Sequence, residues 1–190
     1  MLGSMFAVLI LSQIIFFGGM LACIVIKPAG LGANDGISYY GTYAQTIVPY
    51  IFALAGSSLA GLYAVNKFIR ASGFNYVKLI MLTIFVLAIG VILTPYDYNR
   101  LFSNLHELFG TLTFILQGVL SIRLVFFVLK DRTNMLLILI ELIGGLMSAY
   151  YLNPKQGLLI QGQMIFQLGF GLILIRSSAL LSKSPEKIKA

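Results

Sequence analysis

Few side chains in this sequence could do chemistry, and the most informative pair is His106 followed directly by Glu107. A histidine beside a carboxylate can accept and return a proton, directly or through a water molecule. Asp97 is a second carboxylate that could act with His106 in this way. Because His106 is the only histidine and Cys23 the only cysteine, multi-histidine and cysteine-based metal sites are excluded, and we expect no metal and no cofactor.

Glu107 also has a purely structural interpretation. The spacing Asn104-x-x-Glu107 is that of a capping box, in which polar side chains satisfy backbone N–H groups at a helix start. A lone histidine at a membrane interface is also more often a polar anchor than a catalyst. We therefore assign no catalytic residue, and we treat His106 and Glu107 as candidate ligand-binding residues.

Glu141 lies inside an apolar run, about 12 Å from its start if the run is a helix that rises 1.5 Å per residue. Ionisable residues are costly in lipid and are candidate functional sites. Glu141 could titrate during transport, or it could be protonated by desolvation and bonded to a glutamine between two helices. Gln163 and Gln167 lie one helical turn apart, and Gln117 belongs to a polar stripe that starts at His106. A bundle that turned these residues inward would have a polar interior reaching the outer face.

The elements that must position these residues are membrane spans. The chain has 190 residues, of which 59% are hydrophobic and 10% charged, and its mean hydropathy is +0.95. Soluble domains carry about 25% charged residues, so a soluble fold could not cover this much apolar surface. Long unbroken apolar runs favour helices over a barrel, and we predict an all-α polytopic membrane helical bundle. The predicted spans are Met5–Ile26, Tyr43–Val65, Tyr76–Leu93, Asn104–Leu129, Asn134–Leu152 and Gly157–Leu181.

Lysine and arginine residues predict the orientation of this bundle. If the N-terminus is inside, only Lys27, Arg100 and Lys155 fall outside, so both termini are predicted to be cytoplasmic. We expect residues 1–182 to form a single six-helix transmembrane domain and residues 183–190 a short basic cytoplasmic tail. The membrane would be the cytoplasmic (inner) one if the protein is bacterial. The net charge of +7 does not indicate nucleic-acid binding, because the basic residues lie at the ends of apolar runs.

Tyrosines concentrate at the predicted outer ends of the runs. Only Tyr63 and Tyr76 fall at inner ends, whereas an interfacial aromatic belt would be roughly symmetric. The asymmetry indicates a tyrosine-lined mouth on the outer face, where rings with an apolar body and a polar hydroxyl could hold a headgroup or small molecule. The outer tyrosines are Tyr39, Tyr40, Tyr43, Tyr50, Tyr96, Tyr98, Tyr150 and Tyr151.

Small residues recur every four positions in two of the predicted spans. Ala53, Ser57 and Gly61 share one face of the second span, and Gly144 and Ser148 share one face of the fifth. Such faces let helix backbones approach closely in lipid. They favour a compact bundle, a homo-oligomer or a membrane partner, and the sequence does not choose among these.

Two stretches resemble a known family of six-span proteins. Segment 35–43 (Asp-Gly-Ile-Ser-Tyr-Tyr-Gly-Thr-Tyr), followed by Pro49, is similar to the segment leading into the second span of the Frag1/DRAM/Sfk1 group and the related DUF998 membrane proteins. Segment 104–110 (Asn-Leu-His-Glu-Leu-Phe-Gly) resembles the histidine segment that opens their fourth span. Tyr39 stands where that family often has an acid, so a role for that acid does not transfer to this chain.

The resemblance implies work on lipids. Members of the group are associated with lipid-anchor remodelling, with the distribution of phospholipids across the bilayer and with autophagy-related membranes. The positions of this chain that match are Ser38, Gly41 and His106. The resemblance implies that they lie together at the outer face, because the two segments end in neighbouring outer loops.

Three functions follow as hypotheses. In the first, the protein binds or distributes a membrane lipid, with Glu141, Gln163 and Gln167 as a polar floor beneath the mouth. An enzyme acting on lipids is a variant that we do not favour. In the second, it is a small transporter or proton-coupled carrier that uses Glu141, and in the third it is a structural or accessory subunit of a membrane complex. The candidate ligand-binding residues are His106, Glu107, Ser38, Tyr39, Tyr40, Tyr96, Asp97 and Tyr98.

Overall fold

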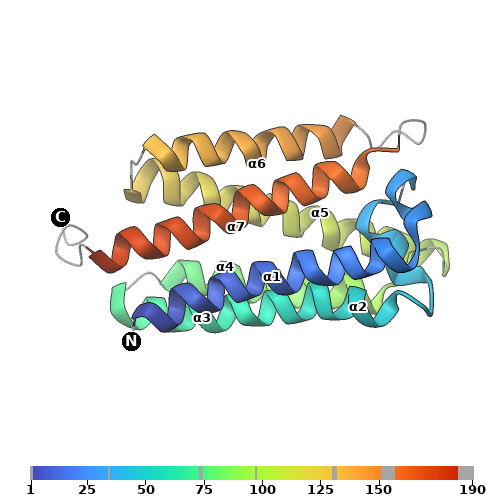
Figure 1. Cartoon of the computed structure of the whole chain (residues 1–190), viewed down its shortest axis with the longest axis horizontal. Helices are drawn as coiled ribbons and strands as arrows, with labels where there is room; N and C mark the ends of the chain where they lie inside the picture. Colours follow the sequence, from blue (N-terminus) through green and yellow to red (C-terminus); the bar gives the residue numbers. More distant parts are fainter. Residues whose placement is uncertain are drawn as a thin grey trace.

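The fold is a bundle of membrane-spanning helices. The described part of the chain contains six helices that are long and apolar enough to cross a membrane, as the apolar runs predict, so the chain is an integral membrane protein. In Figure 1, α1 starts and α7 ends at the same end of the bundle, as an even number of spans requires. The regular elements of the described part of the chain are all helical. The computed structural model describes residues 2–33, 35–72, 75–96, 98–129, 132–150 and 157–183, with side chains at 5–33, 35–66, 75–96, 98–128, 132–150 and 157–180.

The first span is α1 (Leu2–Ile26), and two 3-10 helices, η1 (Pro28–Gly32) and η2 (Gly36–Thr42), follow it. The second span consists of α2 (Ile47–Ile51), the π-helical turn η3 (Phe52–Gly56) and α3 (Ser57–Ser72). The remaining spans are α4 (Asn75–Leu93), α5 (Arg100–Ile122) with its π-helical extension η4 (Arg123–Leu129), α6 (Arg132–Tyr150) and α7 (Leu159–Lys183). Residues 184–190 of the predicted tail lie outside the described residues.

The fourth span begins earlier than the sequence predicts. Asn99 is the N-cap of α5, and its side-chain oxygen accepts a hydrogen bond from the backbone N–H of Phe102 at 2.9 Å. The helix therefore starts at Arg100, and the predicted capping box of Asn104 and Glu107 is wrong. Both residues lie inside the helix, and the side chain of Glu107 is exposed.

Glycines bring α6 and α7 into direct backbone contact. A Cβ added at Gly144 would overlap the backbone nitrogen of Phe166 and would lie 2.7 Å from the carbonyl oxygen of Gly162. A Cβ added at Gly169 would lie 2.7 Å from the Cα of Glu141. The small-residue face of the fifth span is thus occupied by the sixth span of the same chain, so this face supports a compact bundle.

The small-residue face of the second span packs against α1. A Cβ added at Gly19 would lie 2.8 Å from the side chain of Ala53. Nearby, the Ser12 hydroxyl donates a hydrogen bond of 2.7 Å to the carbonyl oxygen of Ser57. A buried serine that bonds to a neighbouring helix is a typical interhelical contact in membranes.

Two apolar clusters fill the bundle, one toward each end, and large apolar side chains also cover the outward faces, as lipid contact requires. The cluster nearer the termini includes Leu9, Val77, Leu124 and Ile138. The cluster at the opposite end includes Phe16, Met20, Cys23, Tyr40, Tyr50 and Ile160. Polar side chains gather between the two clusters, and the second cluster supports the segment that carries the candidate site.

Candidate functional site

His106 is the centre of a buried hydrogen-bonded group at the end of the bundle opposite the termini. It is 6% exposed, and its Nδ1 lies 2.6 Å from the carbonyl oxygen of Thr94, just beyond α4. A carbonyl oxygen only accepts, so Nδ1 carries a proton and donates it to this bond. Nε2 lies 2.5 Å from the hydroxyl oxygen of Ser38. In the neutral ring Nε2 is therefore an acceptor, and the Ser38 hydroxyl donates to it.

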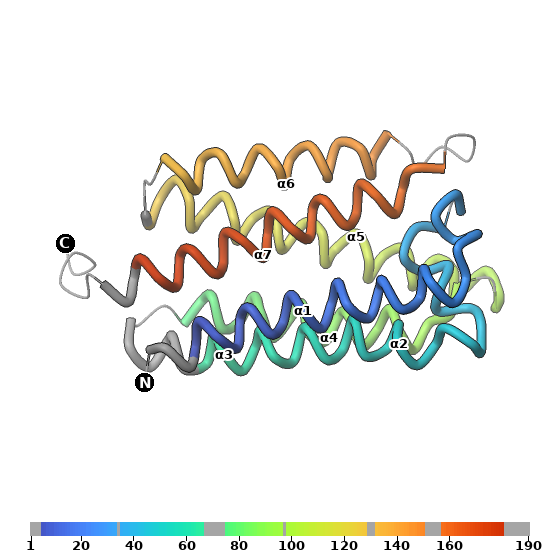
Figure 2. Tube along the Cα trace, in the orientation of Figure 1, coloured from blue at the N-terminus to red at the C-terminus, as the bar shows by residue number. Residues whose placement is uncertain are grey.

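The helix η2 places Ser38 over this histidine. Figure 2 shows the segment between α1 and α2 at the same end of the bundle as the turn from α4 to α5. Gly36 has a positive φ of 61°, which glycine adopts without strain, and a Cβ there would also overlap the side chain of Gln163. Gln163, on α7, accepts a hydrogen bond of 2.8 Å from the backbone N–H of Ile37. The last span thus anchors the residue that precedes Ser38.

Tyr96 and Glu107 border His106 on the side of the α4–α5 turn. The Tyr96 hydroxyl donates to a carboxylate oxygen of Glu107 at 3.5 Å, and the Tyr96 ring meets the His106 ring edge-on, with centroids 5.8 Å apart. His106 is thus paired with Ser38 and not with Glu107, because consecutive helical residues point in different directions. Asp97, the other carboxylate considered as a partner, lies outside the described residues.

A second polar group lies on the neighbouring side of η2. The rings of Tyr39 and Tyr43 are 4.8 Å apart, and the ammonium nitrogen of Lys27 lies 2.8 Å from the Tyr43 ring centroid. A hydrogen bond between the two hydroxyls raises the pKa of Tyr39 to about 12, so this hydroxyl is neutral at physiological pH. The arrangement presents a cation and neutral hydroxyls at the surface, a combination suited to a phosphate group.

Two other candidate tyrosines lie away from His106. Tyr40 is 0% exposed and belongs to the apolar cluster, where its ring occupies the space that a Cβ at Gly30 would need. It supports the candidate site from below and presents no surface to a ligand. Tyr98 is 73% exposed and packs against Phe102, with ring centroids 5.2 Å apart.

A polar cavity of about 80 Å³ lies in the bundle beneath η2, large enough for several water molecules. The Gln117 side-chain amide donates a hydrogen bond of 3.0 Å to Gln167, linking α5 to α7 beside it. Ile37 and Gln163 belong to its lining, so the cavity extends to the segment that carries Ser38. Gln117, Gln163 and Gln167, the three glutamines of the predicted polar interior, all line this cavity. The polar side chains of the lining are Ser12, Gln13, Ser57, Ser58, Thr113, Gln117, Gln163 and Gln167.

Glu141 is not part of this cavity lining. It is 1% exposed, and neither carboxylate oxygen has a hydrogen-bond partner. The Ser121 hydroxyl of α5 adjoins the carboxyl without a well-formed hydrogen bond and is itself unpartnered. The alternative in which Glu141 bonds to a glutamine is therefore wrong: Gln117 bonds to Gln167, and Gln163 bonds to the backbone of Ile37. Glu141 instead lies where α6 and α7 are in backbone contact at Gly169.

We expect Glu141→Gln to stabilise the protein at pH 8. The amide keeps the shape of the side chain, removes the cost of burying an unpaired charge and can donate to Ser121. A gain of about 1 kcal/mol corresponds to a rise in Tm of about 2–4 °C for a chain of this size. Thermal unfolding in detergent measures this, with the exposed Glu107→Gln as a matched control that leaves Tm unchanged. A lower Tm for Glu141→Gln would show that the carboxylate has a stabilising partner.

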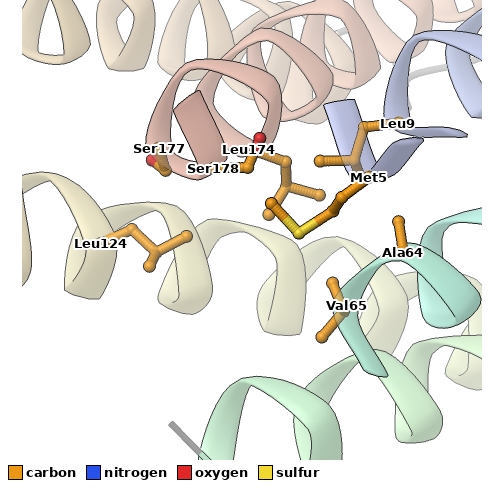
Figure 3. Close-up of a pocket in the computed structure, with 8 residues that line it drawn as sticks. All are labelled: Met5, Leu9, Ala64, Val65, Leu124, Leu174, Ser177 and Ser178. Carbon is orange, nitrogen blue, oxygen red and sulfur yellow. The ribbon is translucent and has the colours of Figure 1, made fainter. Parts of the chain in front are cut away.

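A smaller cavity of about 20 Å³ lies at the apolar cluster nearer the termini. Figure 3 shows the residues around it. It lies between α1, α3, η4 and α7, and it has room for about one water molecule. It is too small for a lipid chain, so it does not compete with the group around His106 as a ligand site. The residues around it are Met5, Leu9, Ala64, Val65, Leu124, Leu174, Ser177 and Ser178.

Comparison with known proteins finds no matching family model, no similar curated protein and no similar solved structure. The Frag1/DRAM/Sfk1 resemblance therefore remains a prediction. The expected proximity of Ser38 and His106 is confirmed, because the two side chains are in hydrogen-bond contact. Gly41, the third matching position, lies against the ring of Tyr50 on α2. Within the described part of the chain, no three His, Cys, Asp or Glu side chains are close enough to hold a metal ion.

Proposed function

We propose that this protein handles a membrane lipid, by binding or distributing it through a headgroup site at the predicted outer end of the bundle. The observation that carries the proposal is the hydrogen-bonded group of Ser38, His106 and the Thr94 carbonyl beneath η2. Polar groups near a membrane surface that are held by packing and by bonds from other spans form a pre-organised site. Tyr96 and Glu107 extend the site toward water.

The depth of His106 fits a lipid headgroup. The fourth span runs from Arg100 to Val128 and has 29 residues, so it is about 40 Å long, whereas the hydrocarbon core of a bilayer is about 30 Å thick. His106 lies about 9 Å from the start of this helix at 1.5 Å per residue. If the helix overhangs both sides about equally, His106 lies near the boundary between hydrocarbon and headgroups, where the ester linkages of phospholipids are found.

The chemistry around η2 fits a phospholipid. Lys27 and the hydroxyls of Tyr39 and Tyr43 provide a cation and hydrogen-bond donors for a phosphate. The Glu107 carboxylate, which is exposed, could pair with an ammonium group of a zwitterionic headgroup. The exposed apolar faces of the surrounding helices would receive the acyl chains.

The other two hypotheses have less support. A proton-coupled carrier would need Glu141 to reach water, and Glu141 is 1% exposed and absent from the lining of the polar cavity. An accessory subunit would use its small-residue faces for a partner, and Gly144 and Gly169 are in contact with neighbouring helices of the same chain. Lipid handling at the site around His106 requires neither access of water to Glu141 nor a free small-residue face. If both termini are cytoplasmic, as predicted, this site faces the outer leaflet of the membrane. In a bacterium that membrane would be the cytoplasmic (inner) membrane.

Mass spectrometry of lipids that co-purify in mild detergent tests the proposal. We expect a single lipid class near one per protein, reduced at least about tenfold by His106→Ala, the loss that removal of about 1.4 kcal/mol of binding free energy produces. Glu141→Gln is the control, because it changes a buried polar residue away from the site. Gel filtration shows whether each variant is folded, and His106→Asn replaces the alanine variant if that one aggregates. Bulk lipid in equal amount in all samples would refute the proposal.

A further inference from the structure

The hydrogen bonds at His106 run in the direction that general-base catalysis requires. Nδ1–H donates to the Thr94 carbonyl oxygen, and this leaves Nε2 free to accept from the Ser38 hydroxyl at 2.5 Å. A serine that donates to a histidine held in one tautomer by a further acceptor is the arrangement that activates serine as a nucleophile. A backbone carbonyl takes the place that a carboxylate has in the Ser-His-Asp triad.

Tyr50 provides a second and independent observation at the same place. Its side chain is 2% exposed, and its hydroxyl lies within range of the Ser38 hydroxyl without a well-formed hydrogen bond. The hydroxyl adjoins Ser38, and the ring lies directly beneath Gly41, where a Cβ would be 2.6 Å from the ring. A buried O–H without an acceptor is costly, so a ligand oxygen beside Ser38 would satisfy it. Tyrosine hydroxyls are among the donors that stabilise oxyanions in acyl transfer.

The polar cavity provides room for water next to this group. Its lining includes Ile37, the neighbour of Ser38, and Gln163, which bonds to the backbone of Ile37. With a volume of about 80 Å³ and several amide and hydroxyl groups in its lining, it can hold hydrogen-bonded water. Water is the co-reactant that hydrolysis of an ester requires.

We propose that Ser38, His106 and Tyr50 form an acyl-transfer site that hydrolyses an ester bond of a membrane lipid. Ser38 is the nucleophile, His106 the general base and acid, and Tyr50 the donor to the oxyanion. The ester as substrate rests on the proposed lipid function, because it is the depth of His106 that brings these groups to the level of the ester linkages. The assignment of Ser38 as the nucleophile depends only on the geometry of the three side chains.

Hydrolysis of an acyl ester at this site has two stages, acylation of Ser38 and its release by water. The Ser38 oxygen bonds to the carbonyl carbon while its proton moves to Nε2 of His106, and the carbonyl oxygen becomes an oxyanion that accepts from Tyr50. The bond to the alcohol oxygen then breaks, and the leaving lysolipid takes the proton from Nε2. Water attacks the acyl-Ser38 ester and gives its proton to Nε2. The fatty acid leaves, and the proton returns to the Ser38 oxygen.

The reaction should be slow compared with that of a full triad. The carbonyl of Thr94 holds the ring in place but carries no charge to stabilise the imidazolium that forms. We therefore expect slow turnover, so covalent labelling of Ser38, which needs only one reaction per protein molecule, is the more sensitive test.

A fluorophosphonate probe that phosphonylates activated serines tests the nucleophile directly. We expect stoichiometric labelling of the wild-type protein, mapped to Ser38 by peptide mass spectrometry, and at least tenfold slower labelling in His106→Asn and Tyr50→Phe. Thr42→Ala is the matched control, because its hydroxyl lies on the same 3-10 helix but donates to the Tyr39 carbonyl. Mapping the label in the wild-type protein needs no variant to fold. Absence of label on Ser38 would overturn the proposal.

Hydrolysis of a phosphatidylcholine vesicle with a fluorescent acyl chain tests the substrate class. Release of fatty acid by the reconstituted wild-type protein, lost in Ser38→Ala and kept in Thr42→Ala, would support the lipid ester. Lipid that co-purifies while Ser38 stays unlabelled would overturn the nucleophile and leave the lipid function standing. Label on Ser38 in a protein that neither retains nor hydrolyses lipid would overturn the lipid ester as substrate.

Discussion

Gly144→Val is expected to destabilise the bundle by about 3 kcal/mol or more, the upper range for overpacking a well-packed interior. A side chain at Gly144 would overlap the backbone of α7 at Phe166 and approach the carbonyl oxygen of Gly162 to 2.7 Å. Backbone atoms cannot rotate away as a flexible side chain can, so the two helices must separate. Their separation would also disturb the glutamines of α7 that line the polar cavity. Thermal unfolding in detergent, followed by tyrosine fluorescence or gel filtration, measures the loss.

The chain offers a close control for this substitution. Gly118 is a helical glycine with no atom of another residue within 4 Å of the position of an added Cβ. Gly118→Ala should leave Tm unchanged or raise it slightly, because alanine is the better helix former by about 1 kcal/mol. If Gly144→Val and Gly118→Ala unfolded at the same temperature, the direct contact between α6 and α7 would be wrong.

Gly41→Val is expected to remove lipid binding while leaving the bundle folded. The Cβ would lie 2.6 Å from the Tyr50 ring, which is buried and cannot rotate aside. Either η2 lifts, which separates Ser38 from His106, or Tyr50 moves out of its place beside Ser38. We expect at least a tenfold loss of co-purified lipid, equivalent to about 1.4 kcal/mol of binding free energy. The same preparation should keep its helical circular dichroism, because the segment lies outside the spans.

Gly32→Val is the matched control for this effect. Gly32 is also in a 3-10 helix at the same end of the bundle, and an added Cβ there would meet no atom within 4 Å. The control should retain lipid at the wild-type level. Equal retention by Gly41→Val would show that the position of η2 over His106 does not matter for binding.

The spans could be predicted from the sequence because a bilayer demands long apolar helices whatever their neighbours are. It was harder to predict which of two asparagines is the N-cap of the fourth span. Asn99 and Asn104 both precede helix-compatible residues, and only the structure shows that Asn99 bonds to the Phe102 amide. The tyrosines at the predicted outer ends show a similar limit. The position of a residue along a span does not determine whether its side chain points into the bundle or toward its surface. Tyr40 is buried, whereas Tyr98 is exposed.

The candidate site was predictable only in part. The histidine segment and the segment before the second span could be singled out, but the bond between Ser38 and His106 joins residues far apart in sequence and depends on how η2 folds. The role of Tyr50 had no local signal, since an unpartnered hydroxyl is a property of packing. Glu141 likewise could not be matched to a partner, because Gln117 and Gln167 bond to each other and Gln163 bonds to the backbone of Ile37.

The most direct test of the lipid site is labelling with a phospholipid that carries a photoactivatable diazirine next to its headgroup, followed by peptide mass spectrometry. Our account predicts adducts concentrated in residues 36–43 and 94–107, the two segments that meet at His106, and their loss in His106→Ala. Adducts spread evenly over both ends of the bundle, or concentrated around Tyr63 near the termini, would contradict a headgroup site at this place.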